Sequence, residues 1–225
     1  MSIRGTVFAA TYDRMMQRAE KAGLTSLRHG LLVQASGRVL EVGGGTGANL
    51  PHYGPAVASL TITDPETPML KRLESRVRAQ AAPATVLRAP AEDLPFEDDT
   101  FDVVVSTLVL CGVDDQPRAV REILRVLRPG GRLLFLEHVR STDPAVARRQ
   151  DRMNWINRAV VCCDCNRPTL STLEGAGFHL DVVAHTGLPK SPSFARPAVV
   201  GTARAPGAAG PATFTALDDP SVTLS

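Results

Sequence analysis

The sequence lacks two features that mark large classes of protein, a long apolar run and a strong excess of one charge. No apolar run approaches the roughly 20 residues that a bilayer span requires, and the N-terminus has no signal-peptide core. The 25 basic and 23 acidic residues leave a formal net charge of +2. A nucleic-acid binder is expected to carry more positive charge or to cluster it. We therefore expect a cytoplasmic protein with no transmembrane segment and no nucleic-acid partner.

Cysteine is also scarce in this chain. The four cysteines are Cys111 and a crowded group of three, Cys162, Cys163 and Cys165. Cysteines this close rarely bridge each other, so the pattern does not indicate a disulfide framework. The metal-ligand spacing Cys-x-x-Cys occurs once, at Cys162 and Cys165, and has no second half. The sequence predicts reduced, partly buried thiols and no metal, with a zinc or arsenic site as the alternative.

The length of 225 residues fits one domain with at most an appended subdomain. Apolar residues make up 44% of the chain and charged residues 21%, which is an ordinary globular balance. We expect an N-terminal helical cap over 1–36, the main domain over 37–203 and a loose tail over 204–225. The tail is rich in Ala, Gly, Pro and Thr without helical or strand periodicity. The sequence does not indicate an oligomeric state.

Apolar segments with strand character alternate with segments of helical periodicity. Strands are predicted at 38–42, 60–63, 85–87, 102–106 and 132–136, and near 178–184 and 197–202. Helices are predicted at 66–79 and 118–127, with two more between residues 7 and 34. Continuous apolar strands separated by helices are typical of a parallel sheet covered on both faces. The predicted fold is therefore an α/β, doubly wound, mostly parallel seven-stranded sheet with an N-terminal helical cap.

A glycine cluster follows the first predicted strand, at Gly43, Gly44, Gly45 and Gly47. Glycines in such a turn let the backbone approach a ligand closely. The spacing nearly matches a dinucleotide fingerprint, which leaves an NAD(P)-dependent oxidoreductase as an alternative. Glu41, two residues before the first glycine, argues against this alternative because its carboxylate would repel a pyrophosphate. It suits a ligand with a positive amino group or sulfonium.

Asp64 ends the second predicted strand, 23 residues after Glu41. An acidic residue at this place accepts hydrogen bonds from ribose hydroxyls in related folds. Alternatively, Asp64 caps the helix that begins at Glu66. A ligand with a ribose and a positive charge but no phosphate fits S-adenosylmethionine.

Five segments in this order make the chain, from about Thr11 to Ala203, resemble class I S-adenosylmethionine-dependent methyltransferases. The resemblance implies a Rossmann-like fold, S-adenosylmethionine as cofactor and methyl transfer to a small-molecule acceptor by in-line displacement. The five segments are 41–47, 63–65, 91–96, 101–105 and 127–131. The cofactor-binding residues that it implies are Glu41, Gly43, Gly45, Asp64, Pro65, Met69, Ala91, Glu92, Thr107 and Leu108.

Segments 106–111, 136–139, 163–169 and 196–197 resemble a narrower subgroup. This subgroup includes bacterial phospholipid-methyltransferase-like enzymes and the alkyl-thiol methyltransferases of animals. Its usual Gly-Cys-His-Leu-Asn-Arg-Asp-Thr reads Cys-Cys-Asp-Cys-Asn-Arg-Pro-Thr here, with Asp164 in place of His and Pro168 in place of the acid. The resemblance implies a thiol acceptor. The alternatives are N- or O-methylation of a lipid or natural product, and a binding protein without turnover.

Candidate catalytic residues follow from the topology, because ligands bind beyond the carboxyl ends of parallel strands. Thr107, Leu108 and Cys111 follow the fourth predicted strand, and Glu137 and His138 end the fifth, so we expect all five to face the crevice. His138 is the candidate general base, because imidazole titrates near working pH; a structural histidine is the alternative. Tyr12 in the N-terminal cap is a candidate lid over the methionine moiety, with plain helix packing as the alternative.

Overall fold

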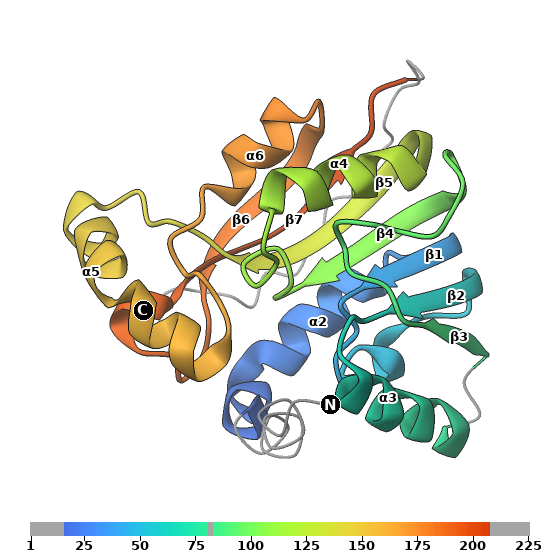
Figure 1. Ribbon diagram of the computed structural model, residues 1–225, viewed down its shortest axis with the longest axis horizontal. Coiled ribbons are helices and arrows are strands. Elements are labelled where there is room, and N and C mark those ends of the chain that lie inside the picture. Colours follow the sequence, from blue (N-terminus) through green and yellow to red (C-terminus); the bar gives the residue numbers. More distant parts are fainter. Residues whose placement is uncertain (1–15, 81–82, 208–225) are drawn as a thin grey trace, which may run out of the picture.

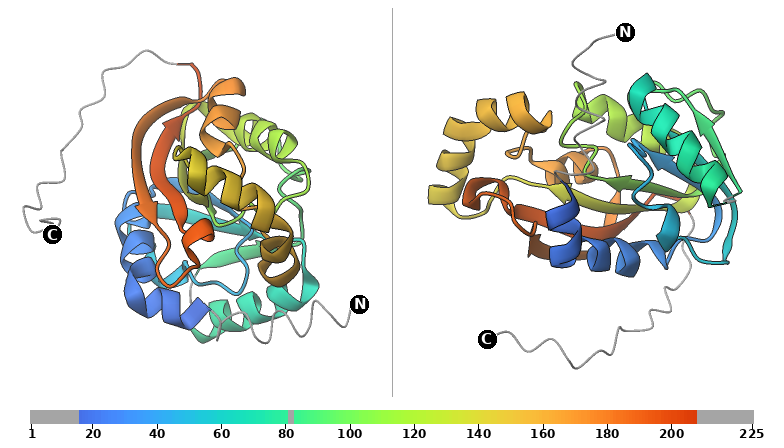
Figure 2. Two further views of the ribbon diagram at one scale, coloured as in Figure 1. Left: turned by 90° about the vertical axis from the view of Figure 1, so that its left-hand side faces the viewer. Right: turned by 90° about the horizontal axis from the view of Figure 1, so that it is seen from below.

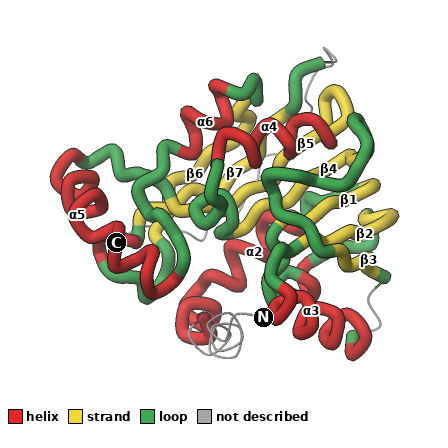
Figure 3. Tube along the Cα trace, viewed as in Figure 1, coloured by secondary structure: helices red, strands yellow, loops and turns green. Residues whose placement is uncertain are grey.

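A computed structural model of the chain describes residues 16–80 and 83–207. Tyr12 and most of the predicted tail lie outside the described residues, so the lid role and the proposed tail stay predictions. The described strands form one sheet in the order β3-β2-β1-β4-β5-β7-β6, side by side in Figures 1 and 3. These strands are β1 (Gly37–Val42), β2 (Val57–Thr63), β3 (Ala84–Leu87), β4 (Phe101–Thr107), β5 (Leu127–His138), β6 (His179–Gly187) and β7 (Pro197–Arg204).

The sheet is mostly parallel. β1 pairs in parallel with β2 and β4, β2 with β3, and β4 with β5. Only β7 runs against its neighbours β5 and β6 among the described strands. The predicted doubly wound, mostly parallel seven-stranded sheet is thus confirmed.

Helices cover both faces of this sheet (Figure 1). On one face, Ile123 of α4 (Gln116–Val126) and Leu173 of α6 (Thr169–Gly175) share a buried cluster with Val104 and Phe135. On the other face, α2 (Thr25–Leu32) and α3 (Thr67–Ala79) bury leucines against alternate strand residues such as Val105. Successive strand side chains point to opposite faces, so these uninterrupted apolar strands contribute side chains to both hydrophobic cores.

One long helix lies away from these faces. α5 (Pro144–Val161) stands at the end of the molecule beyond the carboxyl end of β5 (Figures 1 and 2). Short helical turns occur at η2 (Leu50–His52) and η3 (Ser193–Ala195). None of the described helices is long and apolar enough to cross a membrane.

The described part of the N-terminal cap is helical over 16–32. It includes a π-helical turn, η1 (Glu20–Leu24), that breaks at Gly23, where φ is 125°. The break separates two helical pieces and agrees with the two helices predicted between residues 7 and 34. Leu31 and Leu32 belong to the buried core, so the described end of this segment packs against the sheet. Whether 1–36 forms a separate cap stays a prediction.

The strand predicted at 132–136 begins earlier than expected. β5 already begins at Leu127, which pairs with Phe101, and the pairing then shifts in register before Arg132 pairs with Val103. Gly130, with φ of 73°, lies inside this irregular stretch. The residues therefore form a bulged strand entry, because glycine adopts the left-handed backbone without the strain of a Cβ.

Candidate active site

The glycine loop follows β1 and is hydrogen-bonded to the end of β2. Gly44 donates a backbone hydrogen bond to the carbonyl of Thr63 (2.9 Å), and the Gly45 N–H donates to Oδ2 of Asp64 (2.9 Å). Gly43 and Gly45 have φ values of 61° and 55°, in the left-handed region that disfavours residues with a Cβ. The loop therefore has a fixed course, set by its glycines and by the adjacent strand end.

The four glycines of this loop serve two different purposes. A Cβ added at Gly43 would lie 2.5 Å from Val109, one at Gly44 2.2 Å from Ile62, and one at Gly47 2.9 Å from Leu50. These three glycines allow close packing against protein. A Cβ at Gly45 would meet no atom within 4 Å, so the backbone there borders open space. Gly45 is the glycine of this loop that can admit a ligand.

A hollow opens beside Gly45. Four of the predicted cofactor residues line it, namely Glu41, Gly43, Gly45 and Thr107. Gly44 and Thr46 of the glycine segment complete the lining, together with Arg28, Ala48 and Asn49, which sequence reasoning did not single out. The hollow thus contains the residues that the glycine pattern predicts and adds a contribution from the N-terminal helix.

Glu41 is the acid of this hollow, and its carboxylate is buried. Its Oε1 accepts a hydrogen bond from Nδ2 of Asn49 (2.9 Å), and its Oε2 accepts one from the hydroxyl of Tyr53 (2.7 Å). Burial raises the pKa of Glu41 to about 7, although these hydrogen bonds and the charge of Arg28 oppose the rise. A carboxyl group with this pKa is ready to ionise beside a positive ligand near neutral pH.

Arg28 connects the N-terminal helix α2 to the end of β4. Its Nη1 donates to Oδ1 of Asn49 (2.8 Å) and to Oγ1 of Thr107 (2.9 Å), and its Nε pairs with Glu20 (3.0 Å). Nδ2 of Asn49 also donates to Thr107 (2.9 Å). Buried polar groups satisfied in this way hold one another in place, so α2 forms one wall of the site. No local sequence pattern distinguishes Arg28 from a surface arginine.

Asp64 is buried at the end of β2 and accepts two backbone hydrogen bonds. Its Oδ2 accepts from Gly45, and its Oδ1 accepts from the N–H of Glu66 (2.8 Å). Burial raises the pKa of Asp64, and the two backbone hydrogen bonds partly oppose the rise. Because the N-cap position of α3 is Glu66 itself, Asp64 stabilises the turn before the helix and the glycine loop. The ribose contact stays a prediction.

Replacing Asp64 with alanine is expected to weaken S-adenosylhomocysteine binding by roughly 1.5–3 kcal/mol, the value of a hydrogen bond to a charged group. The variant also releases Gly45, so affinity alone does not identify a ribose contact. Calorimetric titration with S-adenosylhomocysteine and its 2′-deoxy and 3′-deoxy analogues separates the two effects. A ribose contact predicts that the parent discriminates against at least one analogue and that Asp64→Ala loses this discrimination. Equal discrimination in both proteins would show that Asp64 stabilises the glycine loop and does not contact the ribose.

The other predicted cofactor residues do not line the hollow. Pro65 is exposed, whereas Met69 and Ala91 are buried. The carboxylate of Glu92 accepts the backbone N–H groups of Asp114 (2.8 Å) and Asp115 (3.3 Å), which ties segment 91–96 to the loop after β4. Their roles toward the cofactor stay predictions.

Leu108 begins the loop after β4 with φ of 61°, a left-handed conformation that is rare for a residue with a Cβ. Its N–H donates to the carbonyl of Leu136 (2.7 Å). Such strained positions persist where the surrounding structure over-determines them, and they cluster at functional sites. Leu108 is therefore held next to Thr107 at the edge of the hollow.

The prediction that Glu137 faces the crevice is wrong. Its side chain is fully buried, and Oε1 accepts from Oγ of Ser106 (2.7 Å) and from the N–H of Val109 (3.0 Å). Oε2 accepts from the N–H of Cys111 (3.3 Å). A loop that turns away from its strand leaves backbone donors unpaired, and Glu137 satisfies them. Its role is to fix the loop after β4.

His138 is also buried, with an exposed fraction of 9%. Its Nδ1 lies 3.2 Å from the sulfur of Cys163 and 3.7 Å from the sulfur of Cys111. Burial lowers the pKa of His138, but the hydrogen bond and charge of Cys111, together with Glu137 and the backbone of Ala195, outweigh it and raise the pKa overall. His138 does not line the hollow beside Gly45. Its role as a base stays a prediction.

Three observations make the residues at this hollow chemically suited to S-adenosylmethionine. The backbone at Gly45 borders open space, the buried acid Glu41 lines that space, and a second acid, Asp64, is bonded to the Gly45 N–H. Acidic groups at these places favour a positively charged ligand over a phosphate group.

Comparisons with known proteins place this site in a family. Residues 40–135 match the family described as a methyltransferase domain. Human thiol S-methyltransferase TMT1A is 31% identical over 210 residues, which cover 87% of this chain and 82% of the relative. Human thiol S-methyltransferase TMT1B is 38% identical over 156 residues, which cover 65% of this chain and 63% of the relative.

A solved structure from Thermotoga maritima, an S-adenosylmethionine-dependent methyltransferase described as a possible histamine N-methyltransferase, has the same fold. It superposes with a TM-score of 0.68 at 22% identity, and the match covers 89% of this chain and 97% of that one. The structural match shows the fold, and the relationship to TMT1A shows the family. The chain belongs to the class I S-adenosylmethionine-dependent methyltransferases and is an enzyme that transfers the methyl group of S-adenosylmethionine.

Proposed function

We propose that the acceptor is a small, largely apolar thiol. The observation that carries this proposal is the 31% identity to a thiol S-methyltransferase over most of both chains. The subgroup segments around Cys111, His138 and Cys163 support it further, because they meet in one place in the fold. Amine and hydroxyl acceptors remain the competing classes.

Methyl transfer requires the protein mainly to position the acceptor against the cofactor. S-adenosylmethionine supplies a methyl group on a positively charged sulfur. The acceptor sulfur must lie in line with that bond, and orientation of this kind is worth on the order of 7–11 kcal/mol. As the new sulfur–carbon bond forms and the old one breaks, the thiol proton must leave. A free thiol with a pKa near 8.5 is only a few per cent thiolate at pH 7, so a nearby base raises the rate.

We keep His138 as the proposed acceptor of that proton, and this proposal predicts a pH-dependent defect. His138→Gln is expected to lower turnover about 100-fold near pH 7, the lower end for general base catalysis. The rate should partly recover as the pH rises through the pKa of the acceptor thiol, because thiolate then forms without a base. Initial rates between pH 6.5 and 9 measure this, with exposed His179→Gln as the control. An unchanged rate at pH 7 would remove His138 as the base.

The acceptor class is tested with a panel of alkyl thiols, amines and phenols of matched size. Purified chain is incubated with S-adenosylmethionine labelled in its methyl group, and the methylated products are identified by mass spectrometry. The proposal predicts label on sulfur and rates that favour apolar thiols. Label confined to amines or phenols would refute the thiol acceptor while leaving methyl transfer intact.

We also propose a cytoplasmic location and no nucleic-acid partner. Four cysteines without a disulfide are typical of a reducing compartment. The net charge of +2 gives little attraction to a phosphate backbone. Fractionation of cells that express the tagged chain tests the location.

A further inference from the structure

Three groups with lone pairs for a soft metal meet beside the loop after β4. They are the sulfurs of Cys111 and Cys163 and Nδ1 of His138, and all three atoms lie within 4.8 Å of one another. They come from three different segments, namely the loop after β4, the end of β5 and the segment after α5. Cys111 and Cys163 are 1% and 7% exposed. The fold therefore brings these three groups together in its interior.

The spacing of these atoms is close to that of a tetrahedral metal site. Zinc lies about 2.3 Å from thiolate sulfur and about 2.0–2.1 Å from imidazole nitrogen, which places neighbouring nitrogen and sulfur ligands roughly 3.6 Å apart. In this structure Nδ1 of His138 lies 3.7 Å from the sulfur of Cys111, close to this value, and 3.2 Å from the sulfur of Cys163, which is about 0.4 Å shorter. We propose that Cys111, His138 and Cys163 bind one thiophilic divalent cation of the zinc class.

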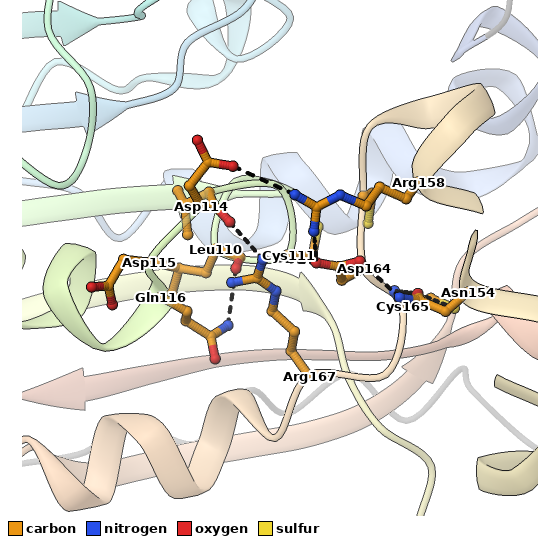
Figure 4. A network of polar contacts seen from close by, with 12 residues as sticks. Leu110, Cys111, Asp114, Asp115, Gln116, Asn154, Arg158, Asp164, Cys165 and Arg167 are labelled. Carbon is orange, nitrogen blue, oxygen red and sulfur yellow. Dashed lines mark hydrogen bonds and ion pairs between the residues drawn. The ribbon is translucent and has the colours of Figure 1, made fainter. Parts of the chain in front are cut away.

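The surrounding contacts hold the cluster in place from the Cys163 side. The N–H of Asp164 donates to the carbonyl of Cys111 (2.8 Å), which joins the two cysteine segments directly. The carboxylate of Asp164 in turn accepts from Asn154 (2.7 Å) and from two arginines, Arg158 and Arg167 (2.8 Å each). Figure 4 shows this network converging on Asp164 beside Cys111. Outer contacts of this kind orient metal ligands and tune affinity.

The Cys111 side is fixed as well. Glu137 accepts from the N–H of Cys111, so the loop that carries this thiol is bonded to β5. His138 ends β5 and pairs with Ala198 of β7, so the backbone that carries the imidazole is fixed by the sheet. All three ligands are therefore held before a cation arrives.

The chemistry of the donor set selects the cation. Two thiolates and one imidazole suit zinc and similar soft or borderline ions, whereas magnesium and calcium require oxygen ligands. The charges of two thiolates and one divalent cation cancel, so the buried site is neutral when occupied. Three protein ligands leave one coordination position open, as in catalytic zinc sites. The cation would occupy the Nδ1 lone pair, so the base role proposed above for His138 applies to the protein without the cation.

Cobalt(II) titration of the full chain tests the site, because thiolate ligands give Co²⁺ an intense near-ultraviolet charge-transfer band. We expect the band to saturate at one Co²⁺ per chain and to disappear when Zn²⁺ is added. Cys111→Ser and Cys163→Ser should each reduce the band by at least half and weaken Co²⁺ affinity at least 100-fold. Cys162→Ser, at an exposed cysteine next to the cluster, is the matched control and should leave the band unchanged.

Two results would overturn the proposal. One is the absence of a band with the reduced parent protein. The other is a band that Cys162→Ser abolishes and Cys111→Ser does not, since the metal would then use the Cys162-x-x-Cys165 spacing. X-ray absorption of the zinc-loaded parent keeps the test decisive if a variant fails to fold. It should show two sulfur ligands and one imidazole ligand, and a shell without sulfur would refute the site.

Discussion

Gly45→Val is expected to lower the affinity for S-adenosylhomocysteine at least 100-fold while the chain remains folded. The new side chain would enter open space beside the hollow, because a Cβ at Gly45 meets no atom within 4 Å. It would therefore displace ligand and not protein. A 100-fold loss corresponds to about 2.7 kcal/mol of binding free energy. Calorimetric titration measures the affinity, and circular dichroism and thermal unfolding check the fold.

The left-handed backbone at Gly45 is a second source of damage that needs its own control. A side chain at φ of 55° costs roughly 1–2 kcal/mol whatever the surrounding space. Gly177, with φ of 105°, is also in a backbone conformation that residues with a Cβ rarely adopt, and a Cβ there meets only Pro206, at 4.0 Å. Gly177→Val should therefore lose stability but keep its affinity. If Gly45→Val binds as tightly as this control, the glycine loop does not hold the cofactor.

Affinity for S-adenosylmethionine is expected to rise about 20-fold between pH 5.5 and 7.5. Burial raises the pKa of Glu41 to about 7, so below this pH the carboxyl group is largely protonated and neutral in the free protein. A positive ligand favours the ionised form, and binding must then release the proton. Affinity therefore rises with pH up to the pKa and levels off above it. Glu41→Gln should remove this rise and leave weak binding at every pH.

Tyr53 provides a directional control for this prediction. Its hydrogen bond to Glu41 lowers the pKa of that acid, so Tyr53→Phe should move the midpoint of the affinity profile to higher pH. Fluorescence or calorimetric titrations at half-unit pH steps resolve the shift. A flat profile in the parent, or a rise that persists in Glu41→Gln, would show that another group binds the positive charge.

The sheet could be predicted because its signals are local. Strand segments such as 102–106 are short apolar runs, and the helices between them show regular apolar spacing. The start of α4 also follows from local residues, since the Asp115 side chain accepts the N–H of Arg118 and Pro117 occupies the first turn. The glycine pattern, with Glu41 before it, likewise indicated the hollow and the sign of its ligand.

The rest of the site depends on contacts between distant residues. Arg28 meets Thr107 across 79 positions, and Asn49 meets Thr107 across 58, so no window of sequence reveals them. Glu137 lies at a strand end where parallel topology predicts an exposed site residue. Its carboxylate is instead buried, because it accepts hydrogen bonds from backbone N–H groups of the loop after β4. His138 lies 25 and 27 positions from its two cysteines, so the only visible metal spacing was the local pair Cys162 and Cys165.

A crystal structure of the chain with S-adenosylhomocysteine would show directly whether the glycine loop at the end of β1 holds the cofactor. We predict electron density for the ligand against Gly45, with the positively charged amino group near Glu41 and a ribose hydroxyl within hydrogen-bond distance of Asp64. Density for the ligand elsewhere on the chain, with the hollow beside Gly45 still open, would show that the glycine loop does not hold the cofactor.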